Sequence, residues 1–341
     1  MQMLIMTQKN LMKPTMMVEL GDEVKIGQPL FEDKKNPGIF FTSPGSGRVS
    51  AINRGARRAL QSVVIDLKGD EEHVDLSKYK TSTAIDNELI KKGLIESGLW
   101  TSFRTRPFSK IPNKASTPKN IFVNCMDTNP LAFNPTSIID SNIKEFLFGL
   151  EILNSLCPQN IFVCIPKNYS LDVSHLNKNI QVHSFSGSHP SGLVGTHMHY
   201  LSPASLNNIN WHISSSDLRR IGTFFMEGRL CLDTTISLAG PQVTNPRLLK
   251  TRLGASTDEI SAGELKGGNN RIISGSILNG REAYGSNAYL GKYHNQISVI
   301  EEPSKDDRLF MNWLRPGFNL FSQLPIYISK LFNNKEFSSI D

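Results

Sequence analysis

The sequence predicts a multidomain protein that combines the α+β and α/β classes, and three observations support this. Its 341 residues exceed what one compact unit usually holds, so we expect two or three domains with separate cores. Residues 14–68 alternate short β-prone runs with turn dipeptides, which is typical of a small sandwich of strands. Residues 86–255 alternate helical and strand patterns, which indicates a mainly parallel sheet with helices on both faces.

The first domain is expected at residues 1–70. Its halves GDEVKIGQPL and SPGSGRV resemble the biotinyl/lipoyl barrel-sandwich fold. A carrier domain of that fold would show a modified lysine at its hairpin tip. Here Lys34 and Lys35 lie beside charged residues and before a proline, so we prefer a structural hairpin. A lipoyl or biotin carrier is kept as an alternative.

Three arginines lie within five residues of one another toward the end of this domain. Arg54, Arg57 and Arg58 form either a solvated turn or a docking patch for the acidic face of a partner. Residues 71–85 follow, rich in Asp, Glu, Lys and Ser, and this composition predicts a linker.

The second domain, residues 86–255, is expected to be Rossmann-like without a nucleotide motif. Asp86 is a good helix N-cap, Gly98 a plausible stop, and Pro135 suits the first turn of a long amphipathic helix. The expected helices span 86–97, 135–156 and 216–228, and the expected strands span 120–125, 160–165, 180–185 and 234–239.

A segment rich in aromatic and cationic residues, which we call the arm, spans Ser97–Pro112 and reads SGLWTSFRTRPFSKIP. Its aromatic rings offer flat apolar area, and its arginines offer rigid forks of hydrogen-bond donors. This combination suits an interface hot spot, and equally an aromatic quinone ring with its carbonyl oxygens. The candidate partner or quinone contacts are Trp100, Phe103, Arg104, Arg106 and Phe108.

A structural interpretation of the arm stays open beside the functional one. Trp100 and Phe108 would then pack beneath the loop, because most aromatic residues next to a sheet belong to its core. The arginines would pair with the carboxylate of Glu96 or Asp127.

Motifs for phosphate binding do not occur in the sequence. A dinucleotide site needs a glycine-rich turn so that backbone N–H groups can approach a pyrophosphate, and neither G-x-G-x-x-G nor G-x-x-x-x-G-K-[ST] is present. The bulky side chains of Phe103, Arg104, Arg106 and Phe108 would obstruct such an approach. No Ser-His-Asp order or G-x-S-x-G elbow indicates nucleophilic catalysis, so no catalytic residue is predicted.

Metal and cluster sites are not predicted either. The four cysteines form no C-x-x-C pair, which argues against an iron–sulfur cluster or a zinc ribbon. His197 and His199 would share one side of a strand and could hold a metal, with His189 nearby. A third ligand is not evident, so we prefer structural histidines and predict no metal.

Charge and hydropathy limit the partners. The net charge of +6 and a pI near 9.0 permit attraction to an anionic protein face or lipid leaflet. Nucleic acid is not expected, because the cations are dispersed without a base-stacking signature. No window approaches the roughly 18–20 apolar residues of a membrane span, and no signal peptide is evident. We expect a cytoplasmic protein that reaches a membrane only through partners.

The third domain is expected at residues 256–303, with strands at 271–278 and 296–300 around a glycine-rich middle. This pattern resembles a small β-grasp, or SLBB-like, ligand-binding module. Residues 304–341 are expected to begin a truncated C-terminal helical region, with a helix at 304–314.

Several long strings carry a resemblance to one family. GLWTSFRTRPFSKIP with IFVNCMDTNPL, NRGARRALQSVVI, HPSGLVGTHMHYLSP, SLAGPQVTNPRLLKTRLGAS and AYLGKYHNQISV resemble, in order, segments of the A subunit of the bacterial sodium-translocating NADH:quinone reductase (the NQR complex). The chain also looks truncated at both ends relative to that family. We therefore expect the barrel-sandwich to lack its opening strands.

The resemblance implies a cofactor-free subunit of a translocase that oxidises NADH, reduces ubiquinone to ubiquinol and moves Na+ across the inner membrane. The complex uses FAD, FMN, riboflavin, Fe–S centres, NADH, ubiquinone and Na+, none of them expected on this chain. The implied partners are five other subunits, above all the quinone-binding membrane subunit, which is the B subunit of the complex. The implied location is peripheral on the cytoplasmic side. A stand-alone flavin or NADH oxidoreductase and a decayed copy remain alternatives.

Overall fold

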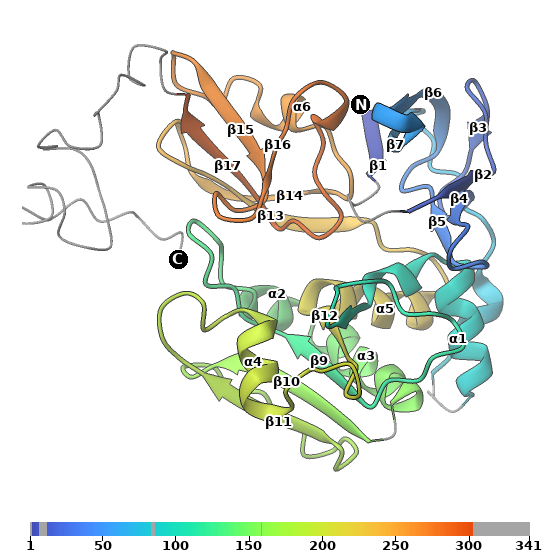
Figure 1. Cartoon of the computed structure of the whole chain (residues 1–341), viewed down its shortest axis with the longest axis vertical. Coiled ribbons are helices and arrows are strands. Elements are labelled where there is room, and N and C mark those ends of the chain that lie inside the picture. The colour runs from blue at the N-terminus through green and yellow to red at the C-terminus, as the bar shows by residue number, and fades with distance from the viewer. Residues whose placement is uncertain (1, 7–11, 83–85, 158, 303–341) are drawn as a thin grey trace, which may run out of the picture.

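The structure, a computed structural model, describes residues 2–6, 12–82, 86–157 and 159–302 (Figure 1). It consists of three domains, and the first and third lie side by side above the α/β domain in this view. The Gln61 side chain of the first domain accepts a hydrogen bond from the Ser286 hydroxyl of the third, at 3.1 Å. The helix expected at 304–314, and the whole region 304–341, lie outside the described residues.

The first domain is a sandwich of a four-stranded and a three-stranded sheet, with strand orders β1-β7-β6-β3 and β2-β4-β5. Between the sheets, Phe31 and Phe41 stack with ring centroids 4.7 Å apart, over the buried Val63 and Ile65. The strands are β1 (Gln2–Met6), β2 (Pro14–Met16), β3 (Glu23–Val24), β4 (Pro29–Asp33), β5 (Phe40–Thr42), β6 (Gly47–Arg54) and β7 (Leu60–Leu67).

β1 pairs antiparallel with β7 over all five of its residues and forms one edge of the four-stranded sheet. The expected linker needs correction, because it is packed into the protein: a 3-10 helix spans Ser77–Tyr79, and Leu76 and Tyr79 are buried in the core of the α/β domain. Charged residues surround Leu76 and Tyr79 in the sequence, so the composition of the whole segment predicted a linker.

The α/β domain has a five-stranded sheet in the order β11-β10-β9-β12-β8, in which only β8 is antiparallel. Its strands are β8 (Arg104–Arg106), β9 (Asn120–Asn124), β10 (Asn160–Pro166), β11 (Ile180–Phe185) and β12 (Asn210–Ser214). Its helices are α1 (Asn87–Glu96), α2 (Thr136–Ser141), α3 (Ile143–Leu156), α4 (Val194–Leu201) and α5 (Ser215–Glu227).

Helices cover both faces of this sheet, and apolar side chains along β9 point alternately to the two faces. Ile121 and Val123 point into the large core formed with α1, α3 and α5, whereas Phe122 points into a smaller core with Met198 of α4. The chain runs from β9 outward to β11 and then returns to place β12 on the other side of β9. The carboxyl ends of β9 and β12 therefore flank a topological switch point, where ligands of open α/β sheets usually bind.

The predicted caps of α1 are confirmed, but the second predicted helix is divided. The Asp86 carboxylate accepts hydrogen bonds from the first turn of α1, and Gly98 takes the left-handed conformation that ends it. Asn142 separates α2 from α3, with φ −140° and ψ 42°. Its side-chain amide donates to the carbonyl of Ile138 at 2.9 Å, a local bond that competes with helical pairing.

The third domain begins earlier than expected. The predicted strand at 234–239 is β13, which belongs to this domain's sheet, in the order β14-β13-β17-β15-β16, and not to the α/β sheet. The boundary at 255 is therefore wrong, because local pattern cannot tell which sheet a strand will join. The elements are β13 (Asp233–Ala239), β14 (Arg247–Arg252), α6 (Thr257–Ser261), β15 (Asn270–Ser274), β16 (Arg281–Glu282) and β17 (Gln296–Glu301).

Candidate partner surface on the arm

The inner half of the arm, Leu99–Phe103, belongs to the core. Trp100 and Phe103 are fully buried, and both rings contact Trp211 of β12, at centroid distances of 5.5 and 5.7 Å. The Trp100 indole N–H donates to the carbonyl of Pro112 at 2.9 Å, so this buried polar group is satisfied. Trp100 and Phe103 therefore cannot offer the exposed contact area that the sequence predicted, because the large apolar rings complete the domain core.

Thr101, between these two rings, and Arg104 contact the third domain. The Tyr293 hydroxyl donates to the carbonyl of Thr101 at 2.6 Å, and the Lys292 ammonium donates to the Thr101 hydroxyl. The Arg104 guanidinium lies over the Tyr293 ring, 4.6 Å from its centroid, a cation–π contact. The arm backbone around Thr101 is therefore covered by a loop of the third domain.

Lys292 lies close to the first turns of α5 as well. The pKa of Lys292 is lowered to about 8, mainly by removal from water; the charge of Asp217 opposes this shift and that of Arg220 adds to it. A side chain of the third domain therefore lies close to the start of α5 in the α/β domain.

The outer half of the arm, Arg104–Lys110, reaches solvent. β8 is the edge strand of its sheet, and the chain turns back so that the N–H of Thr105 donates to the carbonyl of Lys110 at 2.7 Å. Phe108 is at the tip of this turn with φ +77° and is 64% exposed. Lys110 lies 5.6 Å from the centroid of the Phe108 ring. A large exposed ring on an edge strand is available to a partner.

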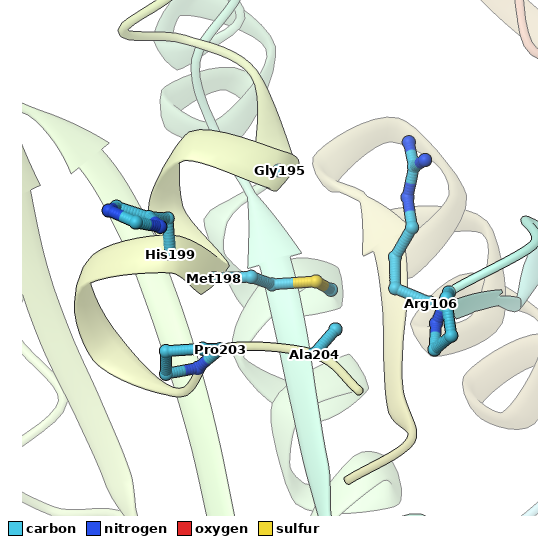
Figure 2. A pocket seen from close by; sticks show the side chains of 7 residues that line it. Arg106, Gly195, Met198, His199, Pro203 and Ala204 are labelled. Carbon is cyan, nitrogen blue, oxygen red and sulfur yellow. The ribbon is translucent and has the colours of Figure 1, made fainter. Parts of the chain in front are cut away.

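Arg106 lines a cavity beside this turn. The cavity has a volume of about 230 Å3 and lies between the arm and α4, with Met198 pointing from the helix toward the arm (Figure 2). Its lining residues are Arg106, Pro107, Gly195, Met198, His199, Pro203 and Ala204.

The electrostatics of this cavity favour an anionic group. Arg106 Nε is buried and has no hydrogen-bond partner among the residues that the structure describes. Burial lowers the pKa of Arg106, and so does the charge of Arg104 on the same face of β8. Burial and both arginine charges lower the pKa of His212 on β12 to about 3, so this imidazole is neutral at neutral pH. An acidic ligand would neutralise the positive charge that is held here.

The carboxylates proposed as structural partners of these arginines are engaged elsewhere. The Glu96 carboxylate pairs with Lys78 at 2.8 Å, and that of Asp127 accepts from the side chain of Asn129 at 2.7 Å. The structural interpretation of the arginines through these two acids is therefore wrong, although it was right for Trp100.

The basic cluster Arg54, Arg57 and Arg58 lies on the exposed turn between β6 and β7. Arg57 and Arg58 have positive φ, and the guanidinium of Arg54 donates to the carbonyl of Arg58 at 3.2 Å. Their role as a docking patch stays a prediction. Lys34 and Lys35 are exposed in the turn after β4, where the Lys35 N–H donates to the Asp33 carboxylate at 3.1 Å.

The histidine expectation is wrong in its geometry. His197 and His199 lie on helix α4, where residues two apart face different directions, so they do not share one side as on a strand. His197 is buried and its Nε2 lies 2.8 Å from the carbonyl oxygen of Ser191, whereas His199 is exposed at the cavity. His189 Nδ1 lies 3.1 Å from the carbonyl oxygen of Thr128. Within the described ranges, no three His, Cys, Asp or Glu side chains are grouped to hold a metal ion.

Sequence reasoning missed His212, Met198, Lys292 and Tyr293 as neighbours of the arm. His212 pairs with Arg104 across β8 and β12, a register between positions about a hundred residues apart. The string GKYHNQ, which contains Lys292 and Tyr293, stood out in the sequence, but nothing local shows which surface it contacts.

Comparison with known proteins agrees with this architecture. The chain is 49% identical over 327 residues to the A subunit of Na(+)-translocating NADH-quinone reductase from Saccharophagus degradans, which covers 96% of this chain and 72% of the relative. The proteins of the same name from Vibrio vulnificus and Pseudomonas aeruginosa are 50% and 46% identical over 329 residues, 96% of this chain and 73% of each relative. The chain belongs to this family, NqrA.

Three domain families of NqrA match in the order of the fold. The NqrA N-terminal barrel-sandwich hybrid domain matches residues 3–68, the NqrA second alpha/beta domain matches 85–230, and the NQRA C-terminal domain matches 235–285. These matches confirm the predicted fold class. Among solved structures, an NAD+-reducing NiFe hydrogenase in the air-oxidized state is similar at a TM-score of 0.47 and 12% identity, over 67% of this chain and 49% of that one. In the described part of the chain, no helix is both long and apolar enough to cross a membrane.

Proposed function

We propose that this chain is a cofactor-free peripheral subunit of a Na+-translocating NADH-quinone reductase, and that the outer half of its arm contacts a neighbouring subunit on the quinone-reducing side. Family membership over 96% of the chain supports a role within such a complex. The proposed contact rests on the environment of Arg106. Its guanidinium is partly buried, its Nε has no partner among the described residues, and its cavity lies next to the exposed ring of Phe108.

The proposal includes the statement that this chain binds no cofactor of its own. Phosphate groups bind where backbone N–H groups are accessible, whereas the Thr101 N–H already donates to the carbonyl of Gly98 at 3.2 Å. Lys292 and Tyr293 occupy the hydroxyl and the carbonyl of the same residue. Side chains of the third domain thus lie against this part of the arm. This favours a scaffolding and contact role over a stand-alone flavin or NADH oxidoreductase.

The partner that fits the outer half is the quinone-binding membrane subunit, approached from the cytoplasmic side. Arg104 and Arg106 supply positive charge on one face of β8, and Phe108 supplies apolar area, which together suit an acidic and aromatic partner surface. A quinone headgroup at the same boundary offers carbonyl oxygens to the same guanidinium groups. Attachment to the membrane would then depend on partner subunits.

The contact is tested by Arg106→Ala in the assembled complex. Because Arg106 Nε bonds to none of the described residues, we expect the isolated variant to melt as the wild type does, while assembly weakens about tenfold or quinone reduction slows comparably. Arg229→Ala is the matched control, because Arg229 is exposed and pairs with Glu227. The proposal fails if Arg106→Ala unfolds the isolated chain, or if its complexes assemble and reduce quinone at the control rate.

The cofactor statement has its own test. Purified chain should bind neither FMN nor NADH above background in equilibrium dialysis, and mass spectrometry should find Lys34 and Lys35 unmodified. Stoichiometric flavin on the chain would favour the oxidoreductase alternative, and a lipoyl or biotin adduct would favour the carrier.

A further inference from the structure

A second cavity, distinct from the one at Arg106, opens at the junction of the α/β and third domains. Its volume is about 310 Å3. Its walls come from the end of α2, the first turns of α5 and the paired strands β13 and β14. Because α5 directly follows β12, the cavity lies at the carboxyl edge of the sheet, near the switch point between β9 and β12.

Three cations line this cavity, and they differ in their acceptors. Arg220 pairs with Asp217 at 2.7 Å and also donates to the carbonyl of Asp233 at 3.3 Å. Lys250 pairs at 2.7 Å with the carboxylate of Asp233, which lines the cavity too. Arg219 instead donates to two uncharged acceptors, the carbonyl of Asp233 at 3.1 Å and the sulfur of Cys231 at 3.4 Å.

The Arg219 guanidinium also keeps an unused donor. Its Nε is buried and, within the part of the chain that the structure describes, has no hydrogen-bond acceptor. A buried charged donor without an acceptor is costly, so the site favours an anion that supplies one.

The remaining lining groups indicate the shape of that anion. Ser216 in the first turn of α5 and Thr235 of β13 place hydroxyl groups on the wall, and Thr235 lies opposite Lys250 in the strand register. Asp217 in the first turn already offsets the partial positive charge at the start of this 13-residue helix, so the positive charge available to an anion comes from Arg219 and Lys250. Donors that come from a helix and from two strands surround a tetrahedral group better than a planar carboxylate.

We propose that this cavity, of about 310 Å3, binds the phosphoryl group of a small phosphorylated molecule that carries no flavin or nicotinamide group. Arg219 forms the principal charge contact, and Ser216, Thr235 and Lys250 donate from the other sides. Since the walls belong to two domains, such a ligand also ties the α/β domain to the third domain. This proposal does not depend on the contact at Arg106.

The test is titration of the purified chain with inorganic phosphate and with pyrophosphate, followed by 31P NMR and by thermal unfolding, at constant ionic strength. We expect saturable binding and a raised melting temperature, with acetate giving a weaker effect than phosphate. Arg219→Gln should weaken binding about tenfold or more, because it removes the charged donor. Arg229→Gln, just beyond the far end of the same helix, should bind as the wild type does.

A second variant keeps the test decisive if Arg219→Gln destabilises the fold. Lys250 is 73% exposed, so Lys250→Gln should fold normally and weaken binding by a smaller factor. The proposal is overturned if neither phosphate nor pyrophosphate binds saturably, if acetate binds as tightly, or if the variants that fold bind like the wild type.

Discussion

The inner half of the arm, Leu99–Phe103, and the outer half, Arg104–Lys110, both contain large aromatic residues but have opposite environments. Trp100 is 1% exposed and Phe108 is 64% exposed, although only eight positions separate them. The difference arises from long-range packing: Trp211 of β12 and the Thr101 contacts with the third domain cover the inner half. In the outer half, the turn that follows the edge strand β8 and leads back to Lys110 leaves the ring of Phe108 exposed. The presence of large aromatic residues alone therefore does not identify a contact surface.

The largest effect that separates the two halves is on stability. Trp100→Ala should lower the free energy of unfolding by about 3–5 kcal/mol, because it removes a buried ring and its hydrogen bond to Pro112. Phe108→Ala should change it by less than about 0.5 kcal/mol, since the ring is exposed. Chemical denaturation of both variants checks this. Similar losses for the two substitutions would show that the division of the arm is wrong.

A second effect comes from Lys292, which covers the inner half. Its pKa is about 8 in the folded chain against 10.5 ordinarily, so between these values the unfolded chain binds more protons and stability rises with pH. Between about pH 8 and 9.5 the free energy of unfolding of the wild type should rise by about 2 kcal/mol more than that of Lys292→Met, which lacks this titrating group. Parallel unfolding profiles for the two proteins across this window would contradict the assigned environment of Lys292.

The smallest expected effect links the outer half to β12. His212 has a folded pKa of about 3, below the ordinary 6.5, so stability falls as pH decreases below 6.5 while the unfolded chain takes up a proton. Arg106→Ala removes one of the charges that lower this pKa, so the pKa of His212 should rise and the loss of stability in acid should shrink. NMR titration of His212 measures this directly. An unchanged His212 pKa in Arg106→Ala would mean that the two groups do not interact.

Much of the fold could be predicted because its signals are local. Asp86 and Gly98 mark the ends of α1, and apolar runs mark β9 and β10, so elements and domain types followed from pattern. What local pattern cannot supply is pairing between distant segments. The pattern therefore placed residues 234–239 in the α/β sheet, whereas β13 pairs in parallel with β17, about sixty residues later.

The candidate site was predictable only in part for the same reason. The arm was recognised from its residue types, and Arg106 and Phe108 remain candidates. That Trp100 and Phe103 are buried depends on Trp211, more than a hundred residues away, and no spacing within the arm encodes that contact.

Hydrogen exchange of the arm, in the isolated chain and in the assembled complex, would locate the contact surface. We predict that amides of residues 99–103 exchange slowly in both states, because they belong to the core and to the contact with the third domain. Amides of the turn at residues 108–110 should exchange quickly in the isolated chain and become protected on assembly. If the turn exchanges equally fast in both states while residues 99–103 gain protection, the contact surface is not on the outer half of the arm.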